Sequence, residues 1–224
     1  MSRAIVAWAV GVFALTVLVQ VPAAFVARQL GWPVGWQPEG VSGSLWDGRA
    51  ARIGALGPVQ WRLRPWAQDA QLNLGFQQRT WRLSIHGWPW RWQAQLVPRS
   101  TGTRTATLFV LDGEWEGHLQ INGAGRSCRS TQGTLLGHDL ALLSPWTVNL
   151  GNTRIQLQCT KGLRLLAQLQ LDAEHSLQLD VDPQGQRARL DGHVEPGAAL
   201  TPLLVQARWL QPTAQTFSKV FGKP

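Results

Sequence analysis

The chain has no tyrosine, one methionine and only two cysteines among its 224 residues, and its acidic residues are few. Two cysteines cannot build a disulfide-rich scaffold, and neither of them has a cysteine or histidine nearby at zinc-ligand spacing. Thirteen acidic residues stand against 21 lysines and arginines, which gives a net charge of +8. An excess of this size can indicate nucleic-acid binding, so its distribution along the chain has to be considered.

The excess of positive over negative charge lies in the first half of the chain. Residues 1–110 hold 11 of the 21 basic residues and 3 of the 13 acidic ones, whereas residues 111–224 hold ten of each. The arginines occur singly, with no run of five or more, so we predict no nucleic-acid partner. Two interpretations of these arginines remain. They lie on solvated strand faces, or they contact anionic lipid headgroups or an acidic partner. The candidates for such contacts are Arg62, Arg64, Arg82 and Arg91.

Only one long hydrophobic run occurs, at the N-terminus. Residues 4–27 carry no charged side chain and lie between Arg3 and Arg28. A bilayer core about 30 Å thick needs roughly 20 apolar residues in a helix. We therefore predict a single transmembrane helix within residues 1–28, followed by a linker at residues 29–40. A cleaved signal peptide is the alternative.

The two cysteines indicate in which cellular compartment the main domain lies. Cys128 and Cys159 form an isolated even pair, which favours one structural disulfide in an oxidising space such as a bacterial periplasm. Closing a loop of about 30 residues would contribute roughly 3–4 kcal/mol. Two buried free thiols are the alternative. We expect a single-pass inner-membrane protein with a cytoplasmic N-terminus and a periplasmic main domain.

From about Val41 onward, apolar and polar residues alternate with period two, as in Val59–Arg64 and Ile155–Cys159. Such alternation is typical of antiparallel strands with one solvated face. We predict a mostly β fold: an elongated, curved antiparallel β-meander of about ten strands, arranged as a sandwich or an open trough. Short helices are expected only near residues 139–143 and 200–210. The β-domain would span residues 41–211, with two lobes joined near residues 100–104, and residues 212–224 would form a frayed tail.

No arrangement of catalytic residues is evident. The five histidines lack metal-ligand spacing and are expected to be solvated, and no nucleophile elbow or dinucleotide fingerprint occurs. Pairs of carboxylates two residues apart, such as Asp180 and Asp182, fit the wet face of a strand better than acid–base chemistry. We predict no enzymatic activity, no cofactor and no metal.

The segment Val41–Ala50, with the sequence VSGSLWDGRA, resembles the signature near the start of the protein N family of the type II secretion system. Its motif positions are Gly43, Leu45, Trp46 and Gly48. The N-terminal apolar segment before the motif, the strand around Trp61 after it and the cysteine pair are also similar to that family. AsmA-like envelope proteins show related strand starts, so a more distant resemblance to them is noted.

The resemblance implies an accessory inner-membrane component that assembles with other parts of the secretion machine and has no enzymatic activity. We expect Gly43 and Gly48 to permit a tight strand entry or a bulge, and Trp46 to seal the first strand against the sheet. Addition of a partner strand to an exposed sheet edge would give a means of assembly. The alternative function is an envelope lipid-binding or lipid-transfer protein that holds acyl chains in an apolar β trough.

Overall fold

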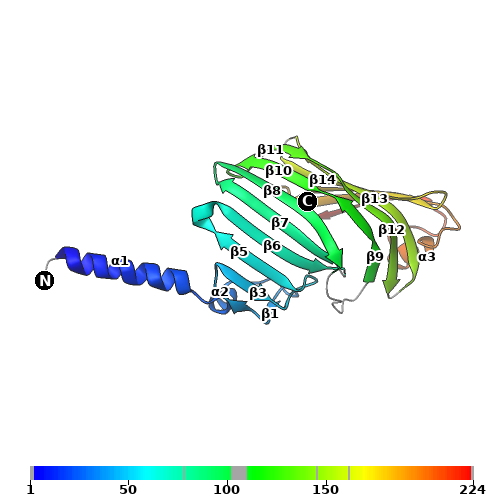
Figure 1. Cartoon of the computed structure of the whole chain (residues 1–224). Coiled ribbons are helices and arrows are strands. Elements are labelled where there is room, and N and C mark those ends of the chain that lie inside the picture. The colour runs from blue at the N-terminus through cyan, green and yellow to red at the C-terminus, as the bar shows by residue number, and fades with distance from the viewer. Residues whose placement is uncertain (1–2, 78, 102–109, 145, 161, 223–224) are drawn as a thin grey trace. The chain divides into compact units, whose positions relative to one another are not determined.

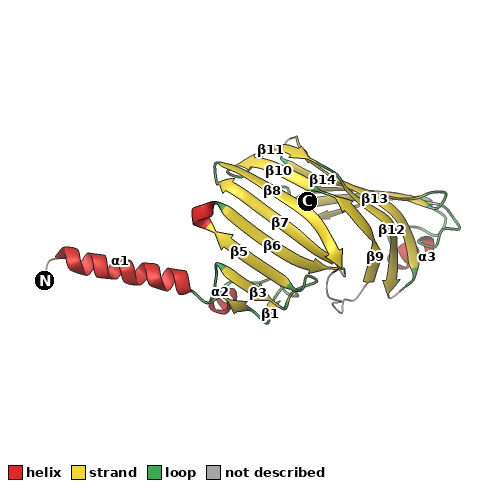
Figure 2. Ribbon diagram, viewed as in Figure 1, coloured by secondary structure: helices red, strands yellow, loops and turns green. Residues whose placement is uncertain are grey.

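The computed structural model describes residues 3–77, 79–101, 110–144, 146–160 and 162–222. The chain divides into two compact units, which we call the N-terminal unit (residues 1–85 and 100–105) and the C-terminal unit (residues 86–99 and 106–224). Antiparallel strands make up most of the described residues, as Figure 2 shows, which confirms the predicted mostly β, antiparallel class.

The described residues contain seventeen strands, where about ten were predicted, because several strands are only two to four residues long. The helices are α1 (Arg3–Gln20), α2 (Ala23–Gln29) and α3 (Thr201–Gln206), with the 3-10 turn η1 (Pro65–Ala67). The first strands are β1 (Pro38–Glu39), β2 (Ser42–Gly43), β3 (Asp47–Ala50), β4 (Arg52–Ile53), β5 (Val59–Arg64), β6 (Asp69–Phe76), β7 (Arg79–Trp88) and β8 (Arg91–Thr101). The remaining strands are β9 (Val110–Gly117), β10 (Leu119–Ala124), β11 (Ser127–Gln132), β12 (Leu135–Ser144), β13 (Val148–Cys159), β14 (Leu163–Leu171), β15 (His175–Asp182), β16 (Arg187–Val194) and β17 (Thr216–Gly222).

Strands that follow one another in sequence mostly pair in space, as Figure 1 shows. One sheet has the order β11-β10-β8-β7-β6-β5-β3-β2, a second has the order β17-β16-β15-β14-β13-β12-β9, and β1 pairs with β4. This is the meander expected when short turns connect strands of period-two sequence.

The predicted transmembrane segment is not one continuous helix. α1 ends at Gln20 and α2 begins at Ala23, with Val21 and Pro22 between them. Proline has no N–H and disfavours helical backbone in the residue before it, which explains the break. Pro22 instead forms an isolated β-bridge with Ser44. Within the part of the chain that the structure describes, no helix is both long and apolar enough to span a bilayer.

Among its described side chains, the N-terminal unit has few buried apolar residues. These are the small side chains Ala23, Ala50 and Val59. The apolar face of its strands is half-buried instead, at positions that alternate with polar ones, as the pattern predicted. The half-buried apolar side chains of β5, β6 and β7 include Trp61, Leu63, Leu72, Leu74, Trp81 and Leu83.

The C-terminal unit contains a larger apolar core. It includes Val194 on β16, which is 1% exposed and is the largest fully buried side chain among the described residues. Phe217 on β17 and Leu204 on α3 pack in the same cluster. Residues Ala198, Leu200 and Leu210 complete it with Val148 on β13. α3 and its flanking turns therefore supply a second apolar layer for this sheet.

Three local predictions differ from the structure. Residues 139–143, expected as a short helix, belong to β12, where the register with β13 shifts around Asp139 (φ 51°) and forms an irregularity in the strand. The helix expected over residues 200–210 is the shorter α3. The tail expected to fray contains β17, which pairs with β16 from Thr216 to Gly222. Each of these runs is too short for its hydrophobic periodicity to distinguish a strand from a helix.

The predicted junction near residues 100–104 falls partly outside the described residues. The predicted limits of the linker and of the β-domain stay predictions.

Candidate functional site

The family-like motif forms the first β-hairpin, in which β2 and β3 are joined by a turn over residues 44–47. Gly43 has φ +90°, and a Cβ there would lie 2.5 Å from the carbonyl oxygen of Asp47. A side chain is therefore excluded at this position. The hydroxyl of Ser44 accepts hydrogen bonds from the backbone N–H of Asp47 at 3.0 Å and of Trp46 at 3.3 Å. The Ser44 side chain thus stabilises the turn through bonds to the turn's own backbone, which is a common role of serine.

The tip of this hairpin is tied to the segment before it and to the strand after it. The backbone N–H of Leu45 donates to the carbonyl oxygen of Val21, between α1 and α2, at 3.0 Å. On the other side, Trp61 Nε1 donates to the Leu45 carbonyl at 3.1 Å, and the N–H of Leu63 donates to the Trp46 carbonyl. The motif therefore connects the break between the two N-terminal helices to β5.

Gly48 has a role that differs from the expected strand entry or bulge. It is the cross-strand partner of Trp61, in regular register between β3 and β5. A Cβ on Gly48 would lie 2.4 Å from Cζ2 of Trp61, so the indole lies directly over the glycine. The Trp61 indole therefore covers this strand at Gly48. Trp46 contacts Trp66 with ring centroids 6.5 Å apart, and its expected sealing role stays a prediction.

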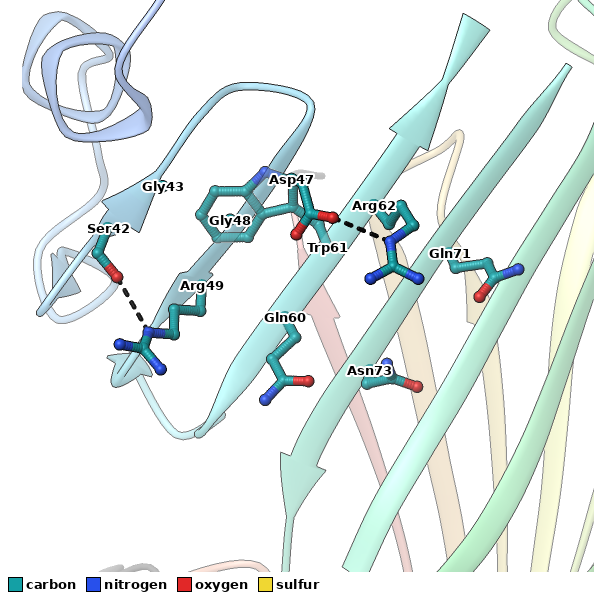
Figure 3. A pocket seen from close by; sticks show the side chains of 10 residues that line it. All are labelled: Ser42, Gly43, Asp47, Gly48, Arg49, Gln60, Trp61, Arg62, Gln71 and Asn73. Atoms are coloured by element: carbon teal, nitrogen blue, oxygen red, sulfur yellow. Dashed lines mark hydrogen bonds and ion pairs between the residues drawn. The ribbon is translucent and has the colours of Figure 1, made fainter. Parts of the chain in front are cut away.

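A polar pocket of about 430 Å³ lies over the same strands on the face that carries the polar residues of β5 and β6. Figure 3 shows its side chains projecting from β2, β3, β5 and β6. The residues that line it are Ser42, Gly43, Asp47, Gly48, Arg49, Gln60, Trp61, Arg62, Gln71 and Asn73.

Strand register places the polar lining in two cross-strand rows. The first row runs from Arg49 through Gln60 to Asn73, which are successive register partners on β3, β5 and β6. The second row consists of Asp47, Arg62 and Gln71 on the same three strands. Because side chains two residues apart on a strand share a face, both rows project into one pocket.

The two arginines of the pocket are held by their Nε atoms. Arg49 Nε donates to the Ser42 hydroxyl at 3.1 Å, and Arg62 Nε donates to Asp47 Oδ2 at 2.9 Å (Figure 3). The Arg62 and Asp47 side chains are 52% and 63% exposed, so this ion pair contributes little to stability. Its effect is to orient the guanidinium.

The four arginines proposed from the sequence do not form one site. Arg62 lines the pocket, and Arg82 on β7 adjoins it because its Nε donates to Asn73 Oδ1 at 3.1 Å. Arg64 is opposite Asp69 on β6 and does not line the pocket. Arg91, at the start of β8, is exposed and belongs to the C-terminal unit.

Sequence reasoning missed the pocket's other polar residues. Arg49, Gln60, Gln71 and Asn73 each look like an ordinary solvated strand position. The available signal was the alternation of polar residues in β3, β5 and β6, and it identifies a shared face only once the register is known.

The two cysteines form the predicted disulfide, and the free-thiol alternative is wrong. Cys128 on β11 and Cys159 on β13 are bonded, with their Cα atoms 5.6 Å apart. Near this bond, the Thr131 hydroxyl donates to the Leu157 carbonyl at 2.8 Å. Within the C-terminal unit, the disulfide therefore joins a strand of the eight-stranded sheet to a strand of the seven-stranded sheet.

One histidine departs from the expected solvation. His175 is 3% exposed, and its Nε2 lies 3.2 Å from the Leu150 carbonyl oxygen. Its strand, β15, lies inside the sheet between β14 and β16, which the sequence pattern did not reveal. Among the described residues, no group of three or more histidine, cysteine, aspartate or glutamate side chains is placed to hold a metal ion.

Comparison with known proteins gives one result. The family model described as "Type II secretion system (T2SS), protein N" matches residues 34–208, which include the hairpin, the pocket and the disulfide. No curated protein and no solved structure matches the chain.

Proposed function

The chain belongs to the protein N family of the type II secretion system, and from this premise we propose that it works in that machine as an accessory component that acts by protein–protein contact, without catalytic activity of its own. The observation that carries the proposal is the family match over residues 34–208. The polar pocket beside the family motif supports the contact role, because its side chains present hydrogen-bonding groups from neighbouring strands of one sheet.

We further propose that the N-terminal segment attaches the chain to the inner membrane, with the N-terminus in the cytoplasm and both β units in the periplasm. α1 supports this placement because its apolar side chains are open to the surroundings: Trp8 is 77% and Phe13 71% exposed. Exposed apolar surface of this kind is stable when lipid covers it. The Cys128–Cys159 disulfide fits an oxidising compartment.

Co-purification tests the secretion role. After extraction in mild detergent, the tagged full-length chain is expected to bring down inner-membrane components of the secretion machine. A Gly43→Val variant, which strains the motif hairpin and its link to Val21, is expected to lose them. Recovery of the wild-type chain alone in repeated preparations would contradict the role.

Protease protection tests the location. In spheroplasts, externally added protease is expected to digest the β units of the full-length chain, while a cytoplasmic marker stays intact. Digestion of the β units only after the inner membrane is opened would place them in the cytoplasm.

Lipid binding is the second candidate function. The half-buried apolar face of β5, β6 and β7 in the N-terminal unit favours it, since the described apolar core cluster lies wholly in the C-terminal unit. Native mass spectrometry of the purified chain discriminates between the two functions. Bound phospholipid that persists after delipidating washes supports the trough, and a bare polypeptide mass opposes it.

A further inference from the structure

The polar pocket of the N-terminal unit has hydrogen-bonding capacity that its own residues leave unused. Arg49 and Arg62 each use only Nε, and among the described residues no group accepts from their terminal Nη atoms. Gln60, between them on β5, is exposed, and its side-chain amide makes no hydrogen bond to any described residue. Two guanidinium groups and an amide therefore remain available to a ligand.

The spacing of these groups suits an extended ligand. Arg49, Gln60 and Asn73 occupy adjacent strands, and adjacent strands are about 4.8 Å apart, so this row covers about 10 Å. Arg62 lies two residues from Gln60 along β5, which is about 6.6 Å. An extended peptide advances about 3.3 Å per residue, so three or four residues span the row.

The mixed chemistry of the lining favours a polypeptide over a phosphate group. The Gln60 side chain offers both an amide N–H and an amide oxygen. Gln71 keeps its amide oxygen while its Nε2 donates to Asp69 Oδ2 at 3.3 Å, and Asn73 keeps its amide N–H groups while its Oδ1 accepts from Arg82. Asp47 adds a carboxylate. A phosphate has only acceptor oxygens, so it would leave the amide oxygens unpaired and would lie close to the Asp47 carboxylate. A peptide presents both N–H and C=O groups, and acidic side chains on it would pair with the two guanidinium groups.

We infer that this pocket binds an extended acidic segment of a partner polypeptide, with carboxylates on Arg49 and Arg62 and peptide groups on Gln60, Gln71 and Asn73. The inference rests on the proposed function, since it names where and what kind of segment the secretion component would contact. Asp47 competes for Arg62 in the free protein, because its Oδ2 accepts from the guanidinium. Removing its charge is therefore expected to strengthen binding.

The test measures fluorescence anisotropy of a labelled eight-residue peptide of alternating glutamate and serine, titrated with the full-length chain in detergent. The Arg49→Gln, Arg62→Gln double variant is expected to bind about tenfold more weakly, since two exposed charge pairs are lost. Asp47→Asn is expected to bind about two- to threefold more tightly. The matched control is Arg164→Gln, which removes another exposed strand ion pair, Arg164 with Asp180, and is expected to change nothing.

Four results would overturn the inference: no binding of the acidic peptide, equal weakening by Arg164→Gln, no gain from Asp47→Asn, and equal binding of a glutamine-for-glutamate peptide. Phosphatidylglycerol vesicles serve as a competing probe. Vesicle binding that the double variant abolishes, with peptide binding unchanged, would assign the pocket to a lipid headgroup and contradict the peptide proposal.

Co-purification of the same variants separates this inference from the proposed function. If the wild-type chain brings down secretion components but does not bind the peptide, the pocket assignment fails and the secretion role stands. If it binds the peptide as predicted and brings down no component, the pocket assignment stands and the secretion role fails. Circular dichroism of each variant confirms that its β structure is intact.

Discussion

The two units are built from the same kind of strand but are stabilised differently. In the C-terminal unit, α3 and its flanking turns bury apolar side chains against β13, β16 and β17, and a disulfide joins two of its strands. In the N-terminal unit the fully buried apolar residues are small, and the larger apolar side chains are half-buried. Its first strands are held in register by backbone pairing, and the indole of Trp61 covers Gly48.

We therefore assign the main apolar core to the C-terminal unit and the proposed partner contact to the N-terminal unit. The C-terminal unit buries its apolar residues in a core, whereas the N-terminal unit carries most of the excess positive charge, the family motif and the polar pocket. The proposed partner site thus lies on the less tightly packed unit, and local opening there would leave the core of the other unit intact. The following variants test the comparison, from the largest expected effect to the smallest.

Phe217→Ala should cause the largest loss of stability, about 3–5 kcal/mol in the C-terminal unit, because it opens a cavity in the core and uncovers Gly192. Leu72→Ala, on the half-buried face of the N-terminal unit, should cost about 1–2 kcal/mol there. Hydrogen exchange resolved by peptide measures each unit separately, as two units need not unfold in one step. Equal losses in the two variants would contradict the difference in packing.

Replacing both Cys128 and Cys159 by serine should lower the stability of the C-terminal unit by about 3–4 kcal/mol, since the bond closes a loop of 31 residues. Exchange protection of β5 and β6 should stay unchanged. Protection factors of the double variant, compared with those of the wild type, provide the measurement. A loss spread evenly over both units would show that the disulfide stabilises more than its own unit.

Gly48→Ala should cost about 1–3 kcal/mol in the N-terminal unit, because the new Cβ meets the Trp61 indole. Gly123→Ala should cost a similar amount in the C-terminal unit, since Trp92 covers Gly123 in the same cross-strand arrangement. Urea unfolding followed by peptide-resolved hydrogen exchange provides the loss of unfolding free energy for each variant. Gly31→Ala is the control, because no atom lies within 4 Å of its added Cβ. No difference between Gly31→Ala and Gly48→Ala would refute the role of the indole.

The smallest effect is expected at Asp191. The Ser218 hydroxyl across β16 and β17, and then Arg189, hydrogen-bond its carboxylate and hold its pKa below the ordinary value of 3.8. A depressed pKa stabilises the folded state above the unfolded-state pKa, and this contribution disappears as the pH falls through the folded-state pKa, below 3.8. Side-chain carbon NMR should show a titration midpoint below 3.8 that rises in Ser218→Ala. A midpoint at or above 3.8 in the wild type would contradict the contact.

Much of the fold could be predicted from the sequence because period-two alternation is a direct consequence of strand geometry. The strand at Val59–Arg64 and the disulfide between Cys128 and Cys159 follow from local or countable features. The break at Pro22 was also visible, but the length of the apolar run outweighed it in the prediction.

The pocket could not be predicted because it depends on register. Arg49, Gln60 and Asn73 lie 11 and 13 residues apart in sequence and meet only through the turns that connect β3, β5 and β6. Likewise, β17 was missed because seven residues after a proline-rich stretch carry too little periodicity to mark a strand.

Site-specific photocrosslinking in secreting cells tests the central claim most directly. Gln60 in the pocket and Gln168 on β14, both exposed, are replaced in turn by p-benzoylphenylalanine. Irradiation is expected to attach another secretion component to position 60 and not to position 168, and the Arg49→Gln, Arg62→Gln background should reduce the adduct about tenfold. Adducts of equal yield at the two positions, or none with a secretion component at position 60, would contradict the account.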